Sequence, residues 1–184
     1  MATTPKVLTY EEWLEMPEVQ DGIEEVVNGE VRIMPPNKVV HAYTVEELAE
    51  IFRSQFDRKK VWVAISVFGL VIRKDPLTTR VPDLAVFVKA NIVEIDGYIH
   101  SAPELLVEVL SPGNTRAAIE EKIRNYESIR VPEVWVLSPE ARTVEIMQLS
   151  AGRKLETVAI VNQGQIRPKL FPQVTVSIAS IWPR

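Results

Sequence analysis

The sequence predicts an α/β fold of the α+β kind, with a mixed β-sheet flanked by helices. Helical periodicity occurs at 44–57 and again at 115–129, and strand-like runs lie before, between and after these two segments. The chain has 184 residues, of which 46% are hydrophobic, so it is long enough for one well-buried core and short for two. We therefore expect one domain over 1–184, with extra strands in an N-terminal hairpin and in the C-terminal third.

The N-terminal part predicts a short helix followed by a hairpin. Residues 10–16 form a helical pattern that Pro17 closes, and 24–36 place two β-branched runs on either side of Asn28-Gly29. This pair tolerates positive φ at both central turn positions, which is typical of a tight hairpin.

The first long helix is expected at 44–57. Thr44 and Glu47 have the spacing of a capping box, which predicts the start of the helix at this point. Apolar residues then recur at helical spacing and predict a buried stripe: Val45, Leu48, Ile51, Phe52 and Phe56.

The remaining elements alternate between strands and a second helix. The helix at 115–129 carries its own apolar stripe, formed by Ile119, Ile123, Tyr126 and Ile129. An irregular connection is expected at 91–103. Strand-like segments occur at 61–73, 80–88, 104–110, 131–139, 143–149, 154–161 and 173–182.

Composition narrows the function classes. The absence of cysteine excludes disulfides, zinc–thiolate sites and thiol nucleophiles, and fits a cytoplasmic protein. The two histidines, His41 and His100, exclude a multi-histidine metal site within one chain. The N-terminus has no apolar core of a signal peptide, and no apolar run is long enough to cross a membrane. A net charge of −4 argues against avid nonspecific binding of phosphates but permits a local basic patch.

Glu108 is the most unusual residue of the sequence. It interrupts the apolar run 105–110, and strand alternation places it on one face with Leu106 and Leu110. A carboxylate there is costly to desolvate unless a salt bridge or a metal ion compensates it. Both explanations remain open from this residue alone.

Two further residues belong with Glu108. Asp83 begins an otherwise apolar strand, where it is either a turn residue or a ligand. Lys122 lies on the inward stripe of the second helix, where its stem packs and its ammonium either reaches solvent or faces the strand. Two carboxylates from adjacent strands suit Mg²⁺ or Mn²⁺, and the lysine could orient or help deprotonate an attacking water. The three residues together indicate metal-assisted phosphodiester hydrolysis.

The ordered motifs resemble those of the Uma-type putative restriction endonuclease family, within the PD-(D/E)XK nuclease superfamily. Those motifs are P-D at 82–83, E-V-L-S-P at 108–112, Lys122 with Tyr126, and V-P-E-V-W at 131–135. The resemblance covers nearly the whole chain, from YEEWLEMP to IASIW. It implies a restriction-endonuclease-like mixed sheet and a metal-dependent endonuclease.

The resemblance also implies roles for individual residues. Asp83 and Glu108 would bind the metal, with the backbone carbonyl of Val109 as a third ligand, and Lys122 would take the role of the superfamily lysine. Three recurrent positions form an additional candidate set: Glu25, His41 and Tyr126.

The chain departs from the family pattern at three positions. Ala118 stands where the family usually has an aspartate four residues before the lysine, a change that could weaken support of the site. Ser138 replaces a common aspartate, and Asn28 replaces an aspartate in the hairpin turn.

The leading hypothesis is a Mg²⁺-dependent endonuclease acting on DNA, with Mn²⁺ as a substitute metal. The first alternative is a catalytically silent module of the same fold that binds nucleic acid or protein, which Ala118 favours. The second is a structural domain in which arginines pair with the buried acids. An arginine between Asp83 and Glu108 would support this last reading.

Partners are expected to be DNA and a second copy of the chain. Phosphate contacts are assigned to five basic residues: Lys59, Lys60, Arg73, Lys74 and Arg116. The stretch 53–60 is most simply a solvated helix end. A homodimer is expected because two-fold symmetry addresses both strands of a duplex, with the apolar tail residues as its surface: Phe171, Ile178, Ile181 and Trp182.

Overall fold

A six-stranded mixed sheet forms the centre of the protein, as a computed structural model describes it for residues 7–17, 19, 22–66 and 68–183. Its strands follow the order β12-β11-β10-β9-β6-β3. β9 and β10 are parallel, and the other neighbouring pairs are antiparallel. The strand bounds are β3 (Val61–Ile65), β6 (Leu84–Val88), β9 (Leu105–Val109), β10 (Glu133–Ser138), β11 (Thr143–Leu149) and β12 (Leu155–Val161).

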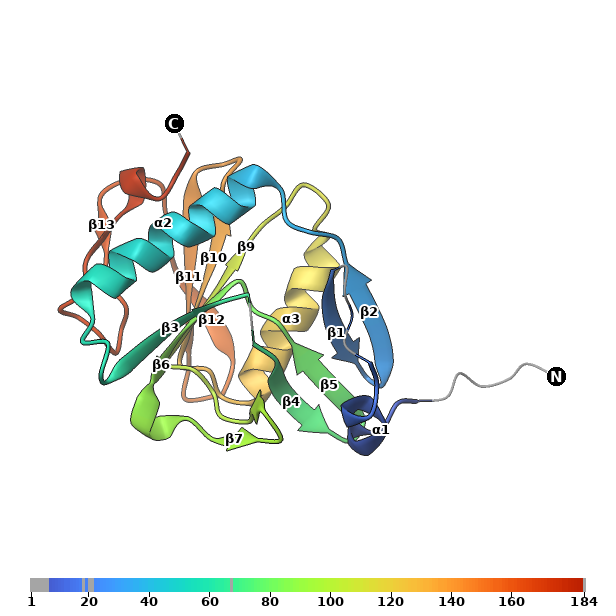
Figure 1. Ribbon diagram of the computed structural model, residues 1–184. Coiled ribbons are helices and arrows are strands. Elements are labelled where there is room, and N and C mark those ends of the chain that lie inside the picture. The colour runs from blue at the N-terminus through green and yellow to red at the C-terminus, as the bar shows by residue number, and fades with distance from the viewer. Residues whose placement is uncertain (1–6, 18, 20–21, 67, 184) are drawn as a thin grey trace.

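Smaller elements surround this sheet (Figure 1). A four-stranded sheet has the order β5-β4-β8-β7, and two short hairpins pair β1 with β2 and β13 with β14. The strand bounds are β1 (Ile23–Val27), β2 (Glu30–Met34), β4 (Leu70–Lys74), β5 (Leu77–Arg80), β7 (Glu94–Ile95), β8 (Tyr98–Ile99), β13 (Gln165–Ile166) and β14 (Val176–Ser177). The helices are α1 (Tyr10–Leu14), α2 (Val39–Gln55) and α3 (Arg116–Ser128), with 3₁₀ turns η1 (Lys89–Asn91) and η2 (Ile178–Ser180).

The two long helices cover opposite faces of the central sheet. On one face, Phe52 of α2 packs against Trp135 of β10, with ring centroids 5.8 Å apart, in a cluster that also contains Val107 of β9. On the other face, Ile123 of α3 packs in a cluster with Leu106 of β9. Because neighbouring residues of a strand point to opposite faces, β9 is buried on both sides.

The first long helix begins earlier than the sequence predicts. α2 starts at Val39, so the capping box expected at Thr44 is wrong: the Thr44 hydroxyl donates to the carbonyl oxygen of Val40 inside the helix. Neither proline nor glycine interrupts 39–43, and the helix gains another turn. That turn carries His41, which sequence reasoning had placed before the helix.

The strand expected at 61–73 is two strands in two different sheets. Ser66 takes a positive φ of 35°, and its N–H donates to the carbonyl of Asp83. The chain thereby leaves the central sheet after β3 and enters the four-stranded sheet at β4. The connection expected to be irregular at 91–103 contains the short pair β7–β8.

Apart from the strand expected at 173–182, the other expected elements are present within a few residues of their predicted bounds. The hairpin turn at Asn28 and Gly29 has positive φ at both positions, 52° and 80°. The strand expected at 173–182 is instead the short β14 followed by η2. The apolar tail residues predicted as a dimer surface lie in the core, so that assignment is wrong: Phe171, Ile178, Ile181 and Trp182.

No helix among the described residues is both long and apolar enough to cross a membrane.

Candidate active site

The candidate site lies at the edge of the central sheet where β9 ends and β6 begins. These strands are antiparallel, with Leu84 opposite Val107. Asp83 immediately precedes β6, and Glu108 is the next-to-last residue of β9, so the register places the two acids beside each other. α3 returns along the face on which Glu108 points and brings Lys122 to it. The structure thus brings together the three residues on which the sequence-based hypothesis depends.

Glu108 is buried, and both of its carboxylate oxygens accept hydrogen bonds from α3. The Tyr126 hydroxyl donates to Oε1, and the Lys122 ammonium donates to Oε2 at 2.8 Å. Glu108 is 3% exposed, and its neighbours on this face, Leu106 and Leu110, belong to the apolar cluster under α3. The buried carboxylate therefore has a cation and a hydroxyl as its partners.

Asp83 is held by the main chain of β9 and by α2. Its Oδ2 accepts the N–H of Val109 at 2.7 Å and lies 3.1 Å from Nε2 of His41. His41 is 5% exposed, and its Nδ1 has no hydrogen-bond partner among the described residues. The first turn of α2 therefore fixes Asp83 from the side of the sheet opposite α3.

Glu25 reaches the site through Lys122. The Lys122 Nζ lies 3.5 Å from Oε1 of Glu25, and this carboxylate also accepts from Arg80 at 2.7 Å and from the N–H of Val81 at 3.1 Å. Within the described chain the arginine of this region pairs with Glu25, and no ion pair joins an arginine to Asp83 or Glu108. The alternative of a purely structural domain predicted an arginine between Asp83 and Glu108, and the described residues do not show one there.

The burial and mutual charge of these groups shift their protonation. Burial raises the pKa of Glu108 to about 7; Lys122 opposes this shift and the nearby charge of Asp83 adds to it. Burial lowers the pKa of Lys122, but the charges of Glu108, Glu25 and Asp83 outweigh burial and hold it above its usual value. Lys122 therefore stays a cation, which favours orienting a water over deprotonating it.

Tyr126 is also kept in its neutral form. Burial, followed by the charges of Glu108 and Glu25, raises the pKa of its hydroxyl well above the usual range. A neutral phenol donates a hydrogen bond to a carboxylate, and this is its role toward Glu108.

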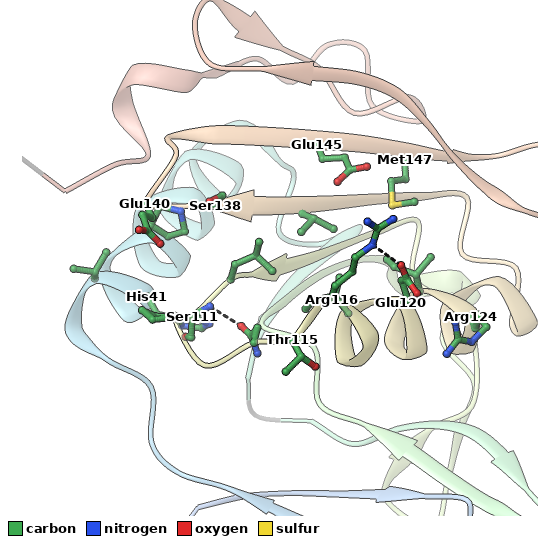
Figure 2. A pocket seen from close by; sticks show the side chains of 18 of the residues that line it. His41, Ser111, Thr115, Arg116, Glu120, Arg124, Ser138, Glu140, Glu145 and Met147 are labelled. Atoms are coloured by element: carbon green, nitrogen blue, oxygen red, sulfur yellow. Dashed lines mark hydrogen bonds and ion pairs between the residues drawn. The ribbon is translucent and has the colours of Figure 1, made fainter.

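A groove of about 1060 Å³ adjoins the acids and runs between α3 and strands β10 and β11. Figure 2 shows its labelled lining residues, with His41 near one end and Met147 on the opposite wall from α3. Its charges are mixed: Arg116 pairs with Glu120 at 2.8 Å across one turn of α3. Asp83, Glu108 and Lys122 do not line the groove itself.

The basic residues assigned to phosphate contacts are scattered. Arg116 lies in the first turn of α3, at the same edge of the sheet as the acids. Lys59 and Lys60 precede β3, at the end of that strand away from Asp83. Arg73 bonds the Asn28 side chain, and Lys74 lies 3.9 Å from the centre of the Tyr10 ring. Of the five, the structure brings only Arg116 to this edge.

Sequence reasoning missed Arg80 and the contacts of Glu121. Arg80 is 2% exposed, and Glu121 accepts hydrogen bonds from Arg80 and Arg32. The one feature of the sequence that could have pointed to Arg80 was the need of a buried Glu25 for a cationic partner. Nothing in the local sequence identified Arg80 as that cation, because 55 residues separate the two.

The chain matches the family model Uma2, described as "Putative restriction endonuclease", over residues 10–179. Among solved structures it resembles the crystal structure of a putative nuclease belonging to DUF820 from Anabaena variabilis ATCC 29413. That likeness has a TM-score of 0.76 at 20% identity, and it covers 95% of this chain and 97% of that chain. No curated protein matches. The family resemblance and the fold class expected from the sequence are thereby confirmed.

We expect the burial of Glu108 to make stability depend on pH. Its carboxyl has a pKa of about 7 in the folded chain against an ordinary 4.5, so the folded state keeps a proton that the unfolded state has lost. The free energy of unfolding should therefore fall as pH rises from about 4.5 to about 7, by on the order of 3 kcal/mol. Glu108→Gln should remove this component in urea unfolding with chelator present.

Glu156→Gln is the matched control, because Glu156 is exposed on β12. It should keep the wild-type dependence on pH. An unchanged pH dependence in Glu108→Gln would contradict the assignment.

Proposed function

The chain belongs to the Uma2 family of putative restriction endonucleases, and from this premise we propose that it hydrolyses DNA phosphodiester bonds with Mg²⁺, or Mn²⁺ in its place. One observation carries the proposal: two buried carboxylates, Asp83 and Glu108, lie on neighbouring strands with the cationic Lys122 at one of them. Acids and a lysine in such proximity are the groups that metal-assisted phosphoryl transfer uses.

The donor atoms fit a hard divalent cation. Asp83 and Glu108 offer carboxylate oxygens, and the carbonyl of Val109 is the proposed third ligand. Oδ1 of Asp83 receives no hydrogen bond from any described residue, which leaves it for a cation. The described chain holds no group of three or more His, Cys, Asp or Glu side chains suited to a metal ion. Mg²⁺ accommodates this donor set because it commonly retains several waters and takes only one or two carboxylates.

The bound metal would polarise the phosphoryl oxygen and lower the pKa of a coordinated water. The protonated Lys122 would orient the attacking water by hydrogen bonding, while Tyr126 keeps the Glu108 carboxylate in place. His41 fixes Asp83 from the opposite side. Glu25 would help to hold the lysine ammonium between two carboxylates instead of binding metal directly.

Two helix N-termini support an anionic substrate at this edge. α2 begins beside Asp83, and α3 begins after the loop that follows β9. Neither helix has an acidic residue in its own first turn, so no acidic side chain of that turn compensates the positive end of either dipole. A phosphate backbone that passes the two acids would meet both ends.

The second candidate function is binding of nucleic acid without cleavage. Ala118 favours it, because the family's usual aspartate would stand on α3 one turn before Lys122. Ala118 is exposed, and its N–H donates to the Thr115 hydroxyl as part of the helix cap. Turnover distinguishes the two functions.

We further propose a homodimer formed through β12, an edge strand of the central sheet. Val158 and Ile160 of this strand are 55% and 65% exposed. An edge strand with exposed β-branched residues is a template for pairing with another strand. A second copy supplies such a strand. Antiparallel pairing of the two β12 strands would join the two central sheets into one continuous sheet with two-fold symmetry.

Metal binding and cleavage should depend on the same two acids. Wild-type protein should bind Mn²⁺ in calorimetry and nick plasmid DNA, and Asp83→Asn and Glu108→Gln should lose both properties. Lys122→Met should lower the cleavage rate by about 100-fold or more, because it removes a positioned donor. Glu156→Gln serves as the control with wild-type behaviour.

Three other outcomes are informative. A wild-type protein that binds no divalent ion, even with DNA present, contradicts the metal-dependent function. Binding of metal and DNA without any product on plasmid, linear duplex or single strands selects the silent module. Cleavage that survives Glu108→Gln places the chemistry elsewhere.

The dimer should depend on the exposed edge. Light scattering of the wild type should give twice the monomer mass, and Ile160→Lys should give the monomer mass because it places a charge on the paired edge. Val39→Lys is the control, since Val39 is 83% exposed and belongs to α2, not to β12. A monomeric wild type at all concentrations would rule out the proposed dimer.

A further inference from the structure

A series of alternating charges runs from the surface to the candidate site. Each member contacts the next, at 2.7, 3.1, 2.7, 3.5 and 2.8 Å, and five elements contribute: β2, α3, β5, β1 and β9. In order, the members are Arg32, Glu121, Arg80, Glu25, Lys122 and Glu108.

We propose that Arg80 is a positioning residue that satisfies Glu25 and so leaves the Lys122 ammonium to Glu108. The inference rests on the proposed function for its catalytic consequence, but its structural content is independent of activity. Arg80 acts through Glu25 and Lys122, and its side-chain hydrogen bonds go to none of the three proposed metal ligands.

The Arg80 guanidinium is engaged on three sides. Nη1 donates to Glu25 at 2.7 Å, Nη2 to Glu121 at 3.1 Å and Nε to the Asn125 side chain at 2.8 Å. Glu121 and Asn125 both lie on α3, whereas Glu25 lies on β1. A planar guanidinium with several fixed donors can hold these elements in one geometry, which a lysine in its place cannot.

Lys122 lies between two competing carboxylates. Its Nζ is 2.8 Å from Glu108 and 3.5 Å from Glu25, so it makes the shorter contact with the proposed metal ligand. Glu25 is 2% exposed, and a buried carboxylate attracts any cation within reach. Without Arg80, the Val81 N–H and Lys122 would be the remaining partners of Glu25 among the described residues, and the lysine would be drawn toward it.

Arg80 is also joined to the Asp83 segment. It ends β5, and the N–H of the next residue, Val81, donates to the same Glu25 carboxylate. Glu25 therefore receives a side-chain and a main-chain donor from adjacent residues, three and two positions before Asp83. This anchors the turn that presents Asp83 to the site.

Arg32 provides a matched control. Its Nη1 contacts the same Glu121 oxygen at 2.7 Å, but its side chain is 45% exposed and forms no ion pair with Glu25 among the described residues. Replacing Arg32 removes a partner of Glu121 without leaving Glu25 unpaired. Any effect specific to Arg80 must therefore pass through Glu25 or Asn125.

The test compares Arg80→Met with Arg32→Met by crystal structure and steady-state kinetics. In Arg80→Met we expect the order of the Lys122 distances to reverse, with Nζ closer to Glu25 than to Glu108. We expect kcat for DNA cleavage to fall about 10- to 100-fold while KM stays within about two-fold, as for the loss of a supporting partner. Arg32→Met should keep both the distances and the kinetics.

The outcomes separate this inference from the proposed function. If Arg80→Met keeps Nζ at Glu108 and away from Glu25, the positioning role is wrong, whatever the activity. If the wild type cleaves no DNA, the proposed function fails, but the distances still decide the role of Arg80. Should Arg80→Met not fold, Arg80→Gln removes the charge but keeps a polar side chain of intermediate length, and a Lys122 position unchanged from wild type there would overturn the inference.

Discussion

The ion pair between Lys122 and Glu108 is the interaction on which the rest of the site depends. A carboxylate in the middle of an apolar strand is costly to bury, and here an ammonium and a phenol from α3 compensate it. The pair also joins the second long helix to the central strand of the sheet. The same contact therefore stabilises the packing and places a cation at the proposed reaction centre.

The sheet topology explains why these groups meet. β9 is buried on both faces, and its parallel connection to β10 runs through α3, which returns along the face of Glu108. β6 is antiparallel to β9, so its first residues lie beside the last residues of β9. α2 then begins at the same edge and fixes Asp83 through His41. One edge of the sheet thus collects two acids, a lysine and two helix N-termini.

Sequence patterns identified the charged side chains that stand in otherwise apolar segments. Glu108 interrupts an apolar strand and Lys122 interrupts an apolar helix stripe, so each required a partner, and the structure makes them partners of each other. The family resemblance added Glu25 and His41, which contact Lys122 and Asp83 respectively. Whether Asp83, Glu108 and Val109 bind a metal stays a prediction.

Other features depend on contacts that no local pattern encodes. Arg80 pairs with a residue 55 positions away. Thr44 and Glu47 have the spacing of a capping box, yet the helix already begins at Val39, because no helix-breaking residue lies between Val39 and Thr44. The run 61–73 reads as one strand, but the contact of Ser66 with Asp83 turns the chain into a second sheet. The sequence predicted that the tail residues Ile178 and Trp182 lie on an exposed strand, but in the structure they belong to the core that α2 covers.

The most direct test of the central claim is a crystal structure of the protein with Mn²⁺, phased to locate manganese by its anomalous scattering. The account predicts one manganese peak in contact with the carboxylates of Asp83 and Glu108, with Lys122 still beside Glu108. A fully occupied crystal without a peak at this edge of the sheet, or with manganese bound only elsewhere, would contradict it.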